Sequence, residues 1–336
     1  MLTRYDARAA ALVAALLTTV ACSDDYVSGP GTPELETVAL VELQDTRPAF
    51  YIQKSDGSAR RRIHFTGAID QVPDNSPLVP DLTDENILAI RSVKWSPDGS
   101  RIAFVATVAH DQAEVVVMKA DGTDARVVSV NFAYIVGDVD WSADGTRLTY
   151  VMATQPSARG LEVFVSDMLD GVPRVTKVTT NSGYRGLGGT IRFASTGNAV
   201  WISQVTDEQG PPLFESVGAV RRVDLATGGI TSVREGIVGE VQAVAHDGTY
   251  AIVLRRKAIT NGVYDSQIVR VPLGASGAEQ LLVDGGRLDY ARLTTDDRRV
   301  LLLRDGAAFT AFDPLGGRVV SLRGSGAEPL SADLRP

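Results

Sequence analysis

The segment VKWSPDGSRIAFVA (Val93–Ala106) decides the fold, because copies of it recur along the chain. The further copies are VDWSADGTRLTYVM (Val139–Met152), IRFASTGNAVWISQ (Ile191–Gln204), AVAHDGTYAIVL (Ala243–Leu254) and RLTTDDRRVLLL (Arg292–Leu303). At the position of Trp95 these copies carry Trp141, Phe193, Val244 and Leu293, at steps of 46, 52, 51 and 49 residues. A period of about 50 residues, built from short strands and tight turns, is typical of a β-propeller.

Each copy predicts a four-stranded antiparallel blade. In the first copy an inner strand ends at Trp95, and the chain turns at Ser96–Gly99, where Pro fixes one φ angle and Gly accepts a positive one. The next three strands are expected at Arg101–Thr107, Glu114–Lys119 and Ala125–Val130. We expect the large apolar residue at the Trp95 position to lie in the core between neighbouring blades.

The number of blades follows from the turns. The inner turn occurs five times and the outer, Asp-Gly-like turn six times, which predicts six blades with one inner strand missing. The first blade is expected to contain only Val38–Leu43, Ala49–Gln53 and Ala59–Phe65. The tail after Arg323 is the expected donor of its inner strand. The prediction is an all-β, six-bladed β-propeller of four-stranded antiparallel blades over residues 38–324, whose first blade is incomplete or closed by the C-terminal tail, residues 325–336.

The N-terminal residues predict export rather than a part of the fold. Arg4 and Arg8 give a basic start, and Ala9–Val20 is an apolar run too short to span a bilayer as a mature helix. Thr19-Val20-Ala21-Cys22 then resembles a bacterial lipobox, whose cysteine is lipidated and becomes the new N-terminus. Residues 1–21 are thus expected to be a lipoprotein signal peptide. The alternative is an ordinary signal peptide followed by a chance cysteine.

Cys22 is the only cysteine of the chain. A lipidated Cys22 would leave no thiol for a disulfide, a zinc–cysteine site or a nucleophile. Ser23 follows it, and the resemblance to Gram-negative lipoproteins then implies the outer membrane rather than the inner one. Residues 22–37 are polar and rich in Gly and Pro, so they predict a flexible tether. We expect a lipid-anchored protein of the cell envelope, at the outer membrane and facing the periplasm.

The charge excludes some partners. The formal net charge is −8, and loss of residues 1–21 would remove two Arg and one Asp, which makes the chain more acidic still. An acidic body suits neither nucleic acid nor an anionic lipid surface. We therefore expect no nucleic-acid partner, a membrane contact through the N-terminal lipid alone, and a monomer.

The repeats also resemble those of a known family. The pattern W-S-P-D-G-x-x-I-A-F followed by V-x-x-A-D-G-T resembles the WD40-like repeats of TolB-type propellers, and of the propeller that covers the active site in prolyl oligopeptidase-like enzymes. The resemblance covers about Val38 to Leu322 and implies the fold far more than a function. TolB has a separate α/β domain before its propeller, and we expect none in this chain. The peptidases carry a hydrolase domain after theirs, and no G-x-S-x-G motif occurs in this chain.

Few residues predict chemistry. His64, His110 and His246 fall in different blades, so we expect surface histidines that hold no metal. The Gly-rich segment Ser182–Thr190 lacks the Lys of a phosphate loop and predicts a rim connection, in which Tyr184 and Arg185 are candidates for contact with a partner. No catalytic residue, metal or cofactor is expected.

The inner strands predict a polar channel. The residues just before the Trp95 position are Lys94, Asp140, Arg192, Ala243 and Arg292, and two residues earlier come Ser92, Asp138, Thr190, Val241 and Tyr290. Because inner strands line the channel, these side chains should crowd together, and buried charges need partners. We expect Asp138 and Asp140 to pair with Lys94 and Arg192 of adjacent blades. Either these residues form an ion network that joins the blades, or they receive a small ligand or a peptide end.

Three functions remain open on the sequence. The first is a lipid-anchored, non-catalytic scaffold that binds other envelope proteins on one face of the propeller. The second is a sensor or carrier that binds a small ligand or peptide in the central channel. The third is an extracytoplasmic lyase or hydrolase, which the absence of a convergent set of carboxylates or histidines disfavours.

Overall fold

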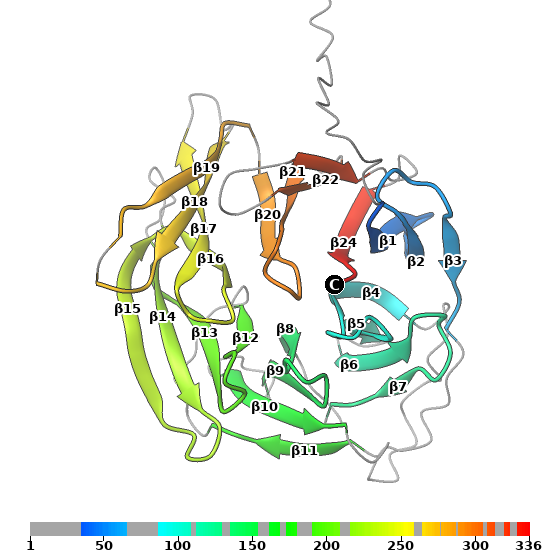
Figure 1. The fold of residues 1–336 in the computed structure, drawn as a ribbon, viewed down its shortest axis with the longest axis horizontal. Coiled ribbons are helices and arrows are strands. Elements are labelled where there is room, and N and C mark those ends of the chain that lie inside the picture. Colours follow the sequence, from blue (N-terminus) through cyan, green and yellow to red (C-terminus); the bar gives the residue numbers. More distant parts are fainter. Residues whose placement is uncertain are drawn as a thin grey trace, which may run out of the picture. The chain divides into compact units, whose positions relative to one another are not determined.

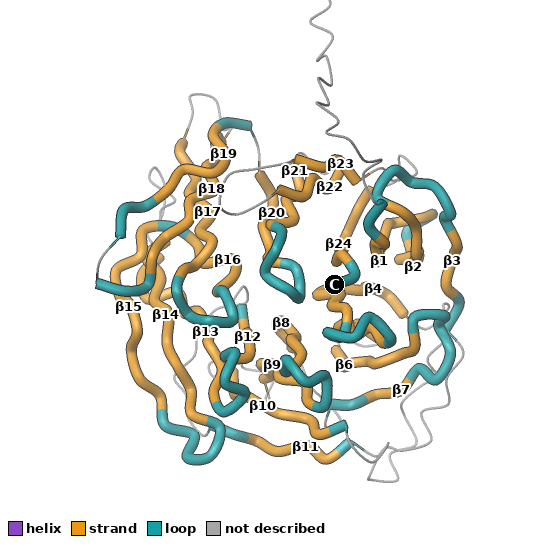
Figure 2. The backbone as a smooth tube through the Cα atoms, viewed as in Figure 1, coloured by secondary structure: helices purple, strands orange, loops and turns teal. Residues whose placement is uncertain are grey.

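The computed structural model describes residues 35–65, 87–108, 112–129, 135–153, 161–168, 173–179, 190–208, 216–258, 264–275, 277–286, 288–304, 308–312, 319–322 and 328–336. Several predictions fall outside these residues: the signal peptide, the lipidated Cys22, nearly all of the tether, His110, Tyr184 and Arg185. The unit Leu35–Pro336 is a ring of six antiparallel sheets of four strands each, which confirms the predicted six-bladed β-propeller (Figure 1). The described residues contain no helix, as the tube in Figure 2 also shows.

Each of the first three blades has one strand at the axis and three more in order outward. Blade 1 consists of β24 (Glu328–Leu334), β1 (Thr37–Gln44), β2 (Arg47–Lys54) and β3 (Arg61–Ile63). Blade 2 consists of β4 (Ile87–Trp95), β5 (Arg101–Val108), β6 (Gln112–Lys119) and β7 (Arg126–Val127). Blade 3 consists of β8 (Ile135–Trp141), β9 (Arg147–Ala153), β10 (Leu161–Asp167) and β11 (Arg174–Lys177).

The other three blades follow the same order. Blade 4 consists of β12 (Ile191–Phe193), β13 (Ala199–Glu208), β14 (Ser216–Asp224) and β15 (Ile230–Val238). Blade 5 consists of β16 (Glu240–Val244), β17 (Tyr250–Ala258), β18 (Tyr264–Pro272) and β19 (Gln280–Asp284). Blade 6 consists of β20 (Leu288–Leu293), β21 (Val300–Arg304), β22 (Ala308–Phe312) and β23 (Val319–Leu322).

The turn between the first two strands of a blade is closed by its own polar residues. In blade 2, Asp98 accepts hydrogen bonds from Ser96 Oγ (2.6 Å) and from Ser100 N (3.0 Å), and Gly99 has φ +65°. The hydrogen bond from Ser96 and those from Ser100 lower the pKa of Asp98 to about 2. The carboxylate therefore caps the turn while ionised, and an Asp-Gly pair marks where the inner hairpins of blades 2, 3 and 5 reverse.

Large apolar residues fill the spaces between blades, as the sequence predicts. Trp95, Trp141, Phe193, Val244 and Leu293 are all buried. Trp95 packs with Phe50 of blade 1 and Phe104 of its own blade in one apolar cluster. Burial of a large side chain contributes about 1.5–3 kcal/mol to stability, so these positions fix the contact between adjacent blades.

An arginine at the start of the second strand also joins one blade to the next. Arg101 donates to Gly145 O (2.7 Å) and lies 5.0 Å from the ring centroid of Trp141. Arg147 repeats this contact one blade further on, toward Gly197 O (2.7 Å) and the ring of Phe193 (5.4 Å).

The C-terminal strand closes the ring. β24 pairs antiparallel with β1 from Val38↔Leu334 to Leu43↔Glu328, which confirms the tail as donor of the missing inner strand. Figure 1 places the end of β24 near the middle of the ring. β24 also reaches blade 2, because Asp333 Oδ2 accepts a hydrogen bond from Trp95 N (2.8 Å).

Candidate functional site

The inner strands bring charged side chains from five of the six blades to the axis of the ring. One residue per inner strand occupies the position before its last large apolar residue: Lys94 on β4, Asp140 on β8, Arg192 on β12, Ala243 on β16, Arg292 on β20 and Asp333 on β24. Asp333 is the sixth member of the series, and the sequence did not predict it. Contacts across the ring show that these residues meet: Lys94 Nζ and Arg192 Nη1 both donate to Leu293 O, at 2.6 and 3.3 Å.

We call the charged residues that gather at the axis the axial cluster: Lys94, Asp138, Asp140, Arg192, His246, Arg292, Asp297 and Asp333. Asp140 is 0% exposed and Arg192 is 1% exposed. Lys94, Asp138 and Asp333 are buried as well. Charges withdrawn from water must be compensated by partners, so the contacts of each member decide what the cluster can do.

Asp140 contacts three neighbours. Its Oδ1 lies 3.7 Å from Arg192 Nη1, which confirms the expected ion pair between blades 3 and 4. Its Oδ2 accepts a hydrogen bond from Phe193 N (2.9 Å) and lies 3.1 Å from His246 Nε2. Burial alone would raise the pKa of Asp140, but Arg192, His246 and Lys94 outweigh it and lower the pKa to about 2. Asp140 is therefore an anion at neutral pH.

Asp138 pairs differently from the prediction. Its Oδ1 lies 2.9 Å from Arg292 Nη1, and its Oδ2 accepts a hydrogen bond from Thr190 Oγ1 (3.2 Å). Arg292 Nη2 also donates to Ser92 Oγ (2.9 Å). Among the described residues, Asp138 forms no ion pair with Lys94 or Arg192. Asp138 lies at an irregularity of the β8–β9 register, between Val136 and Val139, and the long Arg292 side chain reaches it from blade 6.

Lys94 on β4 and Asp333 on β24 influence each other's pKa. Burial lowers the pKa of Lys94, as does the charge of Arg192, and the nearby carboxylates of Asp333, Asp140 and Asp138 oppose this. Burial raises the pKa of Asp333, and the charge of Lys94 opposes it. Asp333 Oδ2 accepts hydrogen bonds from Trp95 N and from Thr295 Oγ1 (2.9 Å), so blades 1, 2 and 6 meet at this carboxylate.

His246 belongs to the axial cluster, contrary to the expectation of a surface histidine. It lies in the turn between β16 and β17, and its side chain is 21% exposed. Nε2 lies 3.1 Å from Asp140 Oδ2, and Nδ1 lies 3.1 Å from Asp297 Oδ2 and from Arg192 Nη2. The sequence held one indication of this: His246 occupies the same turn position as Thr295, which also contacts the axis.

Asp297 was also missed. It stands where the other inner turns carry Gly99, Gly145, Gly197 and Gly248, and it keeps their positive φ, at +59°. Its carboxylate lies 2.5 Å from Arg192 Nη2 and accepts a hydrogen bond from His246 N (2.7 Å). Burial alone would raise the pKa of Asp297, but Arg192 and His246 lower it overall.

The side chains of the axial cluster contact one another. Asp140 and Asp297 face opposite nitrogens of the His246 ring, so these three side chains cannot converge on one metal ion. No group of three or more His, Cys, Asp and Glu side chains among the described residues is arranged to hold a metal. Within the same residues, no helix has the length and apolar character to cross a membrane.

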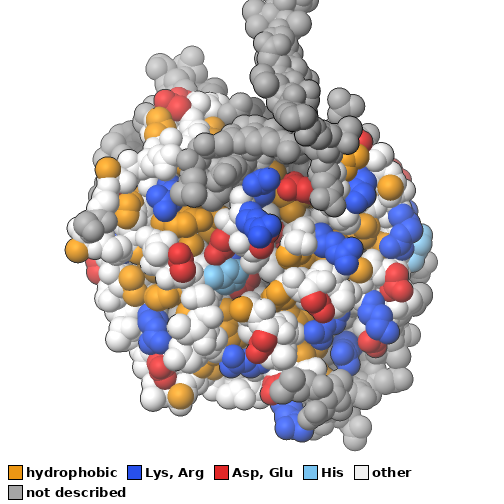
Figure 3. Space-filling model, in the orientation of Figure 1, with side chains coloured by type: hydrophobic (Ala, Val, Ile, Leu, Met, Phe, Trp, Pro, Cys, Tyr) orange, Lys and Arg blue, Asp and Glu red, His pale blue; other side chains and the backbone are white. Residues whose placement is uncertain are grey.

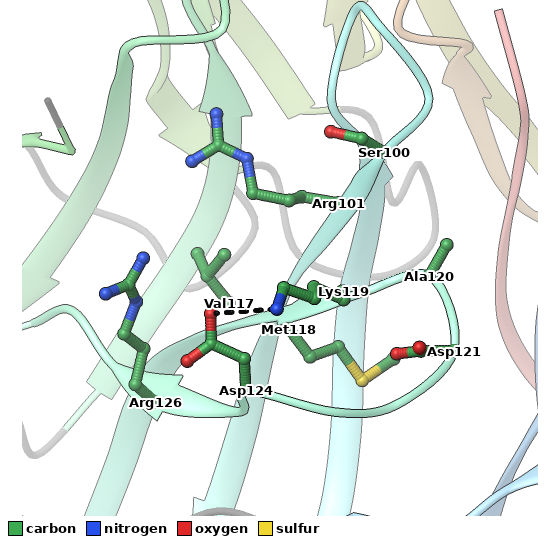
Figure 4. A pocket seen from close by; sticks show the side chains of 9 residues that line it. All are labelled: Ser100, Arg101, Val117, Met118, Lys119, Ala120, Asp121, Asp124 and Arg126. Atoms are coloured by element: carbon green, nitrogen blue, oxygen red, sulfur yellow. Dashed lines mark ion pairs between the residues drawn. The ribbon is translucent and has the colours of Figure 1, made fainter. Parts of the chain in front are cut away.

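A second candidate is a hollow of about 410 Å³ on blade 2, away from the axis. Figure 4 shows three basic side chains around it, Arg101, Lys119 and Arg126, together with the acidic Asp121 and Asp124. Lys119 Nζ lies 3.9 Å from Asp124 Oδ2. On the face of the ring seen in Figure 3, acidic and basic side chains are likewise interspersed. Such mixed charge does not select a ligand of one sign.

Comparison with known proteins supports the fold. No protein-family model and no curated protein matches the chain. Among solved structures, TolB from Acinetobacter baumannii matches with a TM-score of 0.62 and 15% identity, over 90% of this chain and 67% of that one. A chain of the Nidogen/Laminin complex matches with a TM-score of 0.58 and 6% identity, over 89% and 98% of the two chains. Identities this low show a shared β-propeller fold and not a shared function.

Proposed function

We propose that this chain is a lipid-anchored β-propeller of the cell envelope that acts as a non-catalytic scaffold for other proteins. The observation that carries the proposal is the filled axis. Asp140 and Arg192 are buried as an ion pair, and the buried Lys94 and Arg192 both donate to Leu293 O, so these side chains join the blades at the axis. Contact with a partner is then left to the loops and turns of the two faces, where propellers and other rigid folds present variable residues.

Two further observations support a protein partner. The propeller that matches this chain in the Nidogen/Laminin complex belongs to a structure of a protein–protein complex. The acidic balance of the chain, −8 overall, disfavours nucleic acid. The lipid anchor and the place at the outer membrane rest on Thr19–Cys22 and Ser23.

Capture of partners tests the scaffold. The full chain with a C-terminal affinity tag is produced in its native host, cross-linked in intact cells, and purified from the envelope fraction. A scaffold predicts one or a few proteins recovered in amounts comparable to the chain itself. The matched control is a tagged Cys22→Ser variant, which should stay unanchored and recover less of a membrane-bound partner. Recovery of the chain alone, from both variants, would contradict the scaffold.

Lipid labelling tests the anchor separately. Cells producing the full chain are grown with radioactive palmitate, and the expected result is label in the chain and none in Cys22→Ser. Ser23→Ala is the matched control and should keep the label. An unlabelled chain would instead support the ordinary signal peptide.

A further inference from the structure

His246 joins three blades at the axis. It extends from the β16–β17 turn of blade 5 between two carboxylates, Asp140 of β8 and Asp297 of the β20–β21 turn, each 3.1 Å from one ring nitrogen. A carboxylate cannot donate a hydrogen bond while ionised, so each nitrogen needs its own N–H to satisfy these contacts. Only the imidazolium form carries an N–H on both ring nitrogens. The neutral ring could satisfy one carboxylate and accept from Arg192 Nη2 at Nδ1, also at 3.1 Å.

The charges that contact His246 favour the protonated imidazole. They are one cation, Arg192, and two carboxylates, Asp140 and Asp297, whose pKa values are both lowered. With a neutral His246 this group carries one excess negative charge, whereas a protonated His246 balances it. Net charge buried away from water is costly.

Asp297 gives an independent indication. Glycine adopts a positive φ without steric cost, and the four other inner turns carry Gly at this position, whereas Asp297 keeps the same φ with a side chain. From this turn its carboxylate reaches His246 and Arg192. The replacement of Gly by Asp therefore adds to this turn the group that contacts the His246 imidazole.

We propose that His246 is a proton-binding residue whose imidazolium joins blades 3, 5 and 6 at the axis, so that uptake of one proton stabilises the closed ring. This goes beyond the scaffold function, because it makes the stability of the ring depend on the pH outside the cell membrane. The charged groups that face His246 are Asp140 from β8, Arg192 from β12 and Asp297 from the β20–β21 turn.

The direction of the pKa agrees with this geometry. Burial and the charge of Arg192 act to lower the pKa of His246, but Asp140 and Asp297 outweigh them and raise it above its ordinary value of 6.5. A group whose pKa is raised by folding contributes its full stabilisation below the unfolded value and loses it as the pH rises through the folded value. The contribution of His246 to the stability of the propeller should therefore be largest at and below about pH 6.5 and be lost as the pH rises above it.

Nuclear magnetic resonance measures the protonation of His246 directly, as a function of pH. The full chain is labelled at histidine Cε1, and the His246 signal is assigned by its loss in His246→Gln. The expected result is a titration midpoint higher in the folded chain than in the same chain unfolded in urea. A midpoint equal to or below the unfolded value would overturn the proposal, because the positive charge of Arg192 would then keep the His246 imidazole neutral.

Asp297→Gly gives a second test that keeps the fold. It restores the residue found in the other four inner turns and removes only the carboxylate, so it should fold and bring the His246 midpoint down toward the unfolded value. Asp296→Asn, at the neighbouring turn residue, is the matched control and should leave the midpoint unchanged. An unchanged midpoint in Asp297→Gly, or an equal shift in both variants, would contradict the assigned role.

Discussion

At the scale of single residues, Asp140 is where blades 3, 4 and 5 meet. Its removal would leave Arg192 with one carboxylate fewer and Phe193 N without its acceptor. We predict that Asp140→Ala lowers the free energy of unfolding by about 3–5 kcal/mol, as expected when one partner of a buried ion pair is lost. Urea unfolding measures this. Asp144→Ala, which removes an exposed turn carboxylate, is the control and should lower the free energy of unfolding by less. Unchanged stability together with loss of binding of a small ligand would favour the channel as a ligand site.

Acid should unfold the protein through the same residue. The pKa of Asp140 is about 2 in the folded chain, below the ordinary value of 3.8. A carboxyl group with a lowered pKa stabilises the fold above its unfolded value, and this contribution is lost as the pH falls toward the folded value. We predict that the free energy of unfolding falls between about pH 4 and about pH 2, and falls less steeply in Asp140→Asn. Parallel curves for the two proteins would contradict the prediction.

The residues of the axis could be predicted only in part. Lys94, Asp140, Arg192 and Arg292 follow from a repeated position in the sequence, and the pair Asp140–Arg192 follows from adjacent blades. His246 and Asp297 do not, because their turns look like the solvent-exposed turns of the other copies. His246 is 106 residues from Asp140, and only closure of the ring brings them together.

At the scale of elements, β24 is the strand that holds the ring closed. Its Asp333 accepts hydrogen bonds from Trp95 N and Thr295 Oγ1, and therefore links blades 1, 2 and 6. We predict that Asp333→Ala destabilises the protein by about 1–3 kcal/mol, because buried donors lose their acceptor. Asp333→Asn keeps an acceptor oxygen and should destabilise the protein less than Asp333→Ala. Thermal unfolding compares the variants, and equal midpoints for Ala, Asn and the parent would show that β24 does not close the ring through Asp333.

The strands themselves could be predicted well where a hairpin carried its own turn residues. The expected Arg101–Thr107 and Glu114–Lys119 correspond to β5 and β6, because the Asp-Gly turns define their ends. β24 is different. The tail contains Gly, Pro and Ser and has weak strand character, so its place is determined by β1, by Trp95 and by the gap at the axis rather than by local preference.

At the scale of the whole molecule, the period of the repeats predicted the ring, but the contacts that close it depend on three-dimensional structure. Counting inner and outer turns gave six blades and one missing strand. The ion pair of Asp138 with Arg292 joins blade 3 to blade 6 and could not be deduced from neighbouring copies. The fold is therefore predictable from sequence, whereas the axial cluster is predictable only where adjacent blades supply both partners.

Closure of the ring by β24 is the claim on which the axial cluster depends, and an engineered disulfide tests it most directly. Leu40 and Ala332 are paired across β1 and β24 and both are buried in one apolar cluster, and directly opposed residues lie close enough for a disulfide. In a Cys22→Ser background, the pair Leu40→Cys and Ala332→Cys should oxidise to a disulfide seen by mass spectrometry. Leu40→Cys with Ser331→Cys places the two thiols on opposite faces and should not. A disulfide absent from the first pair, or formed equally in both, would contradict the closed ring.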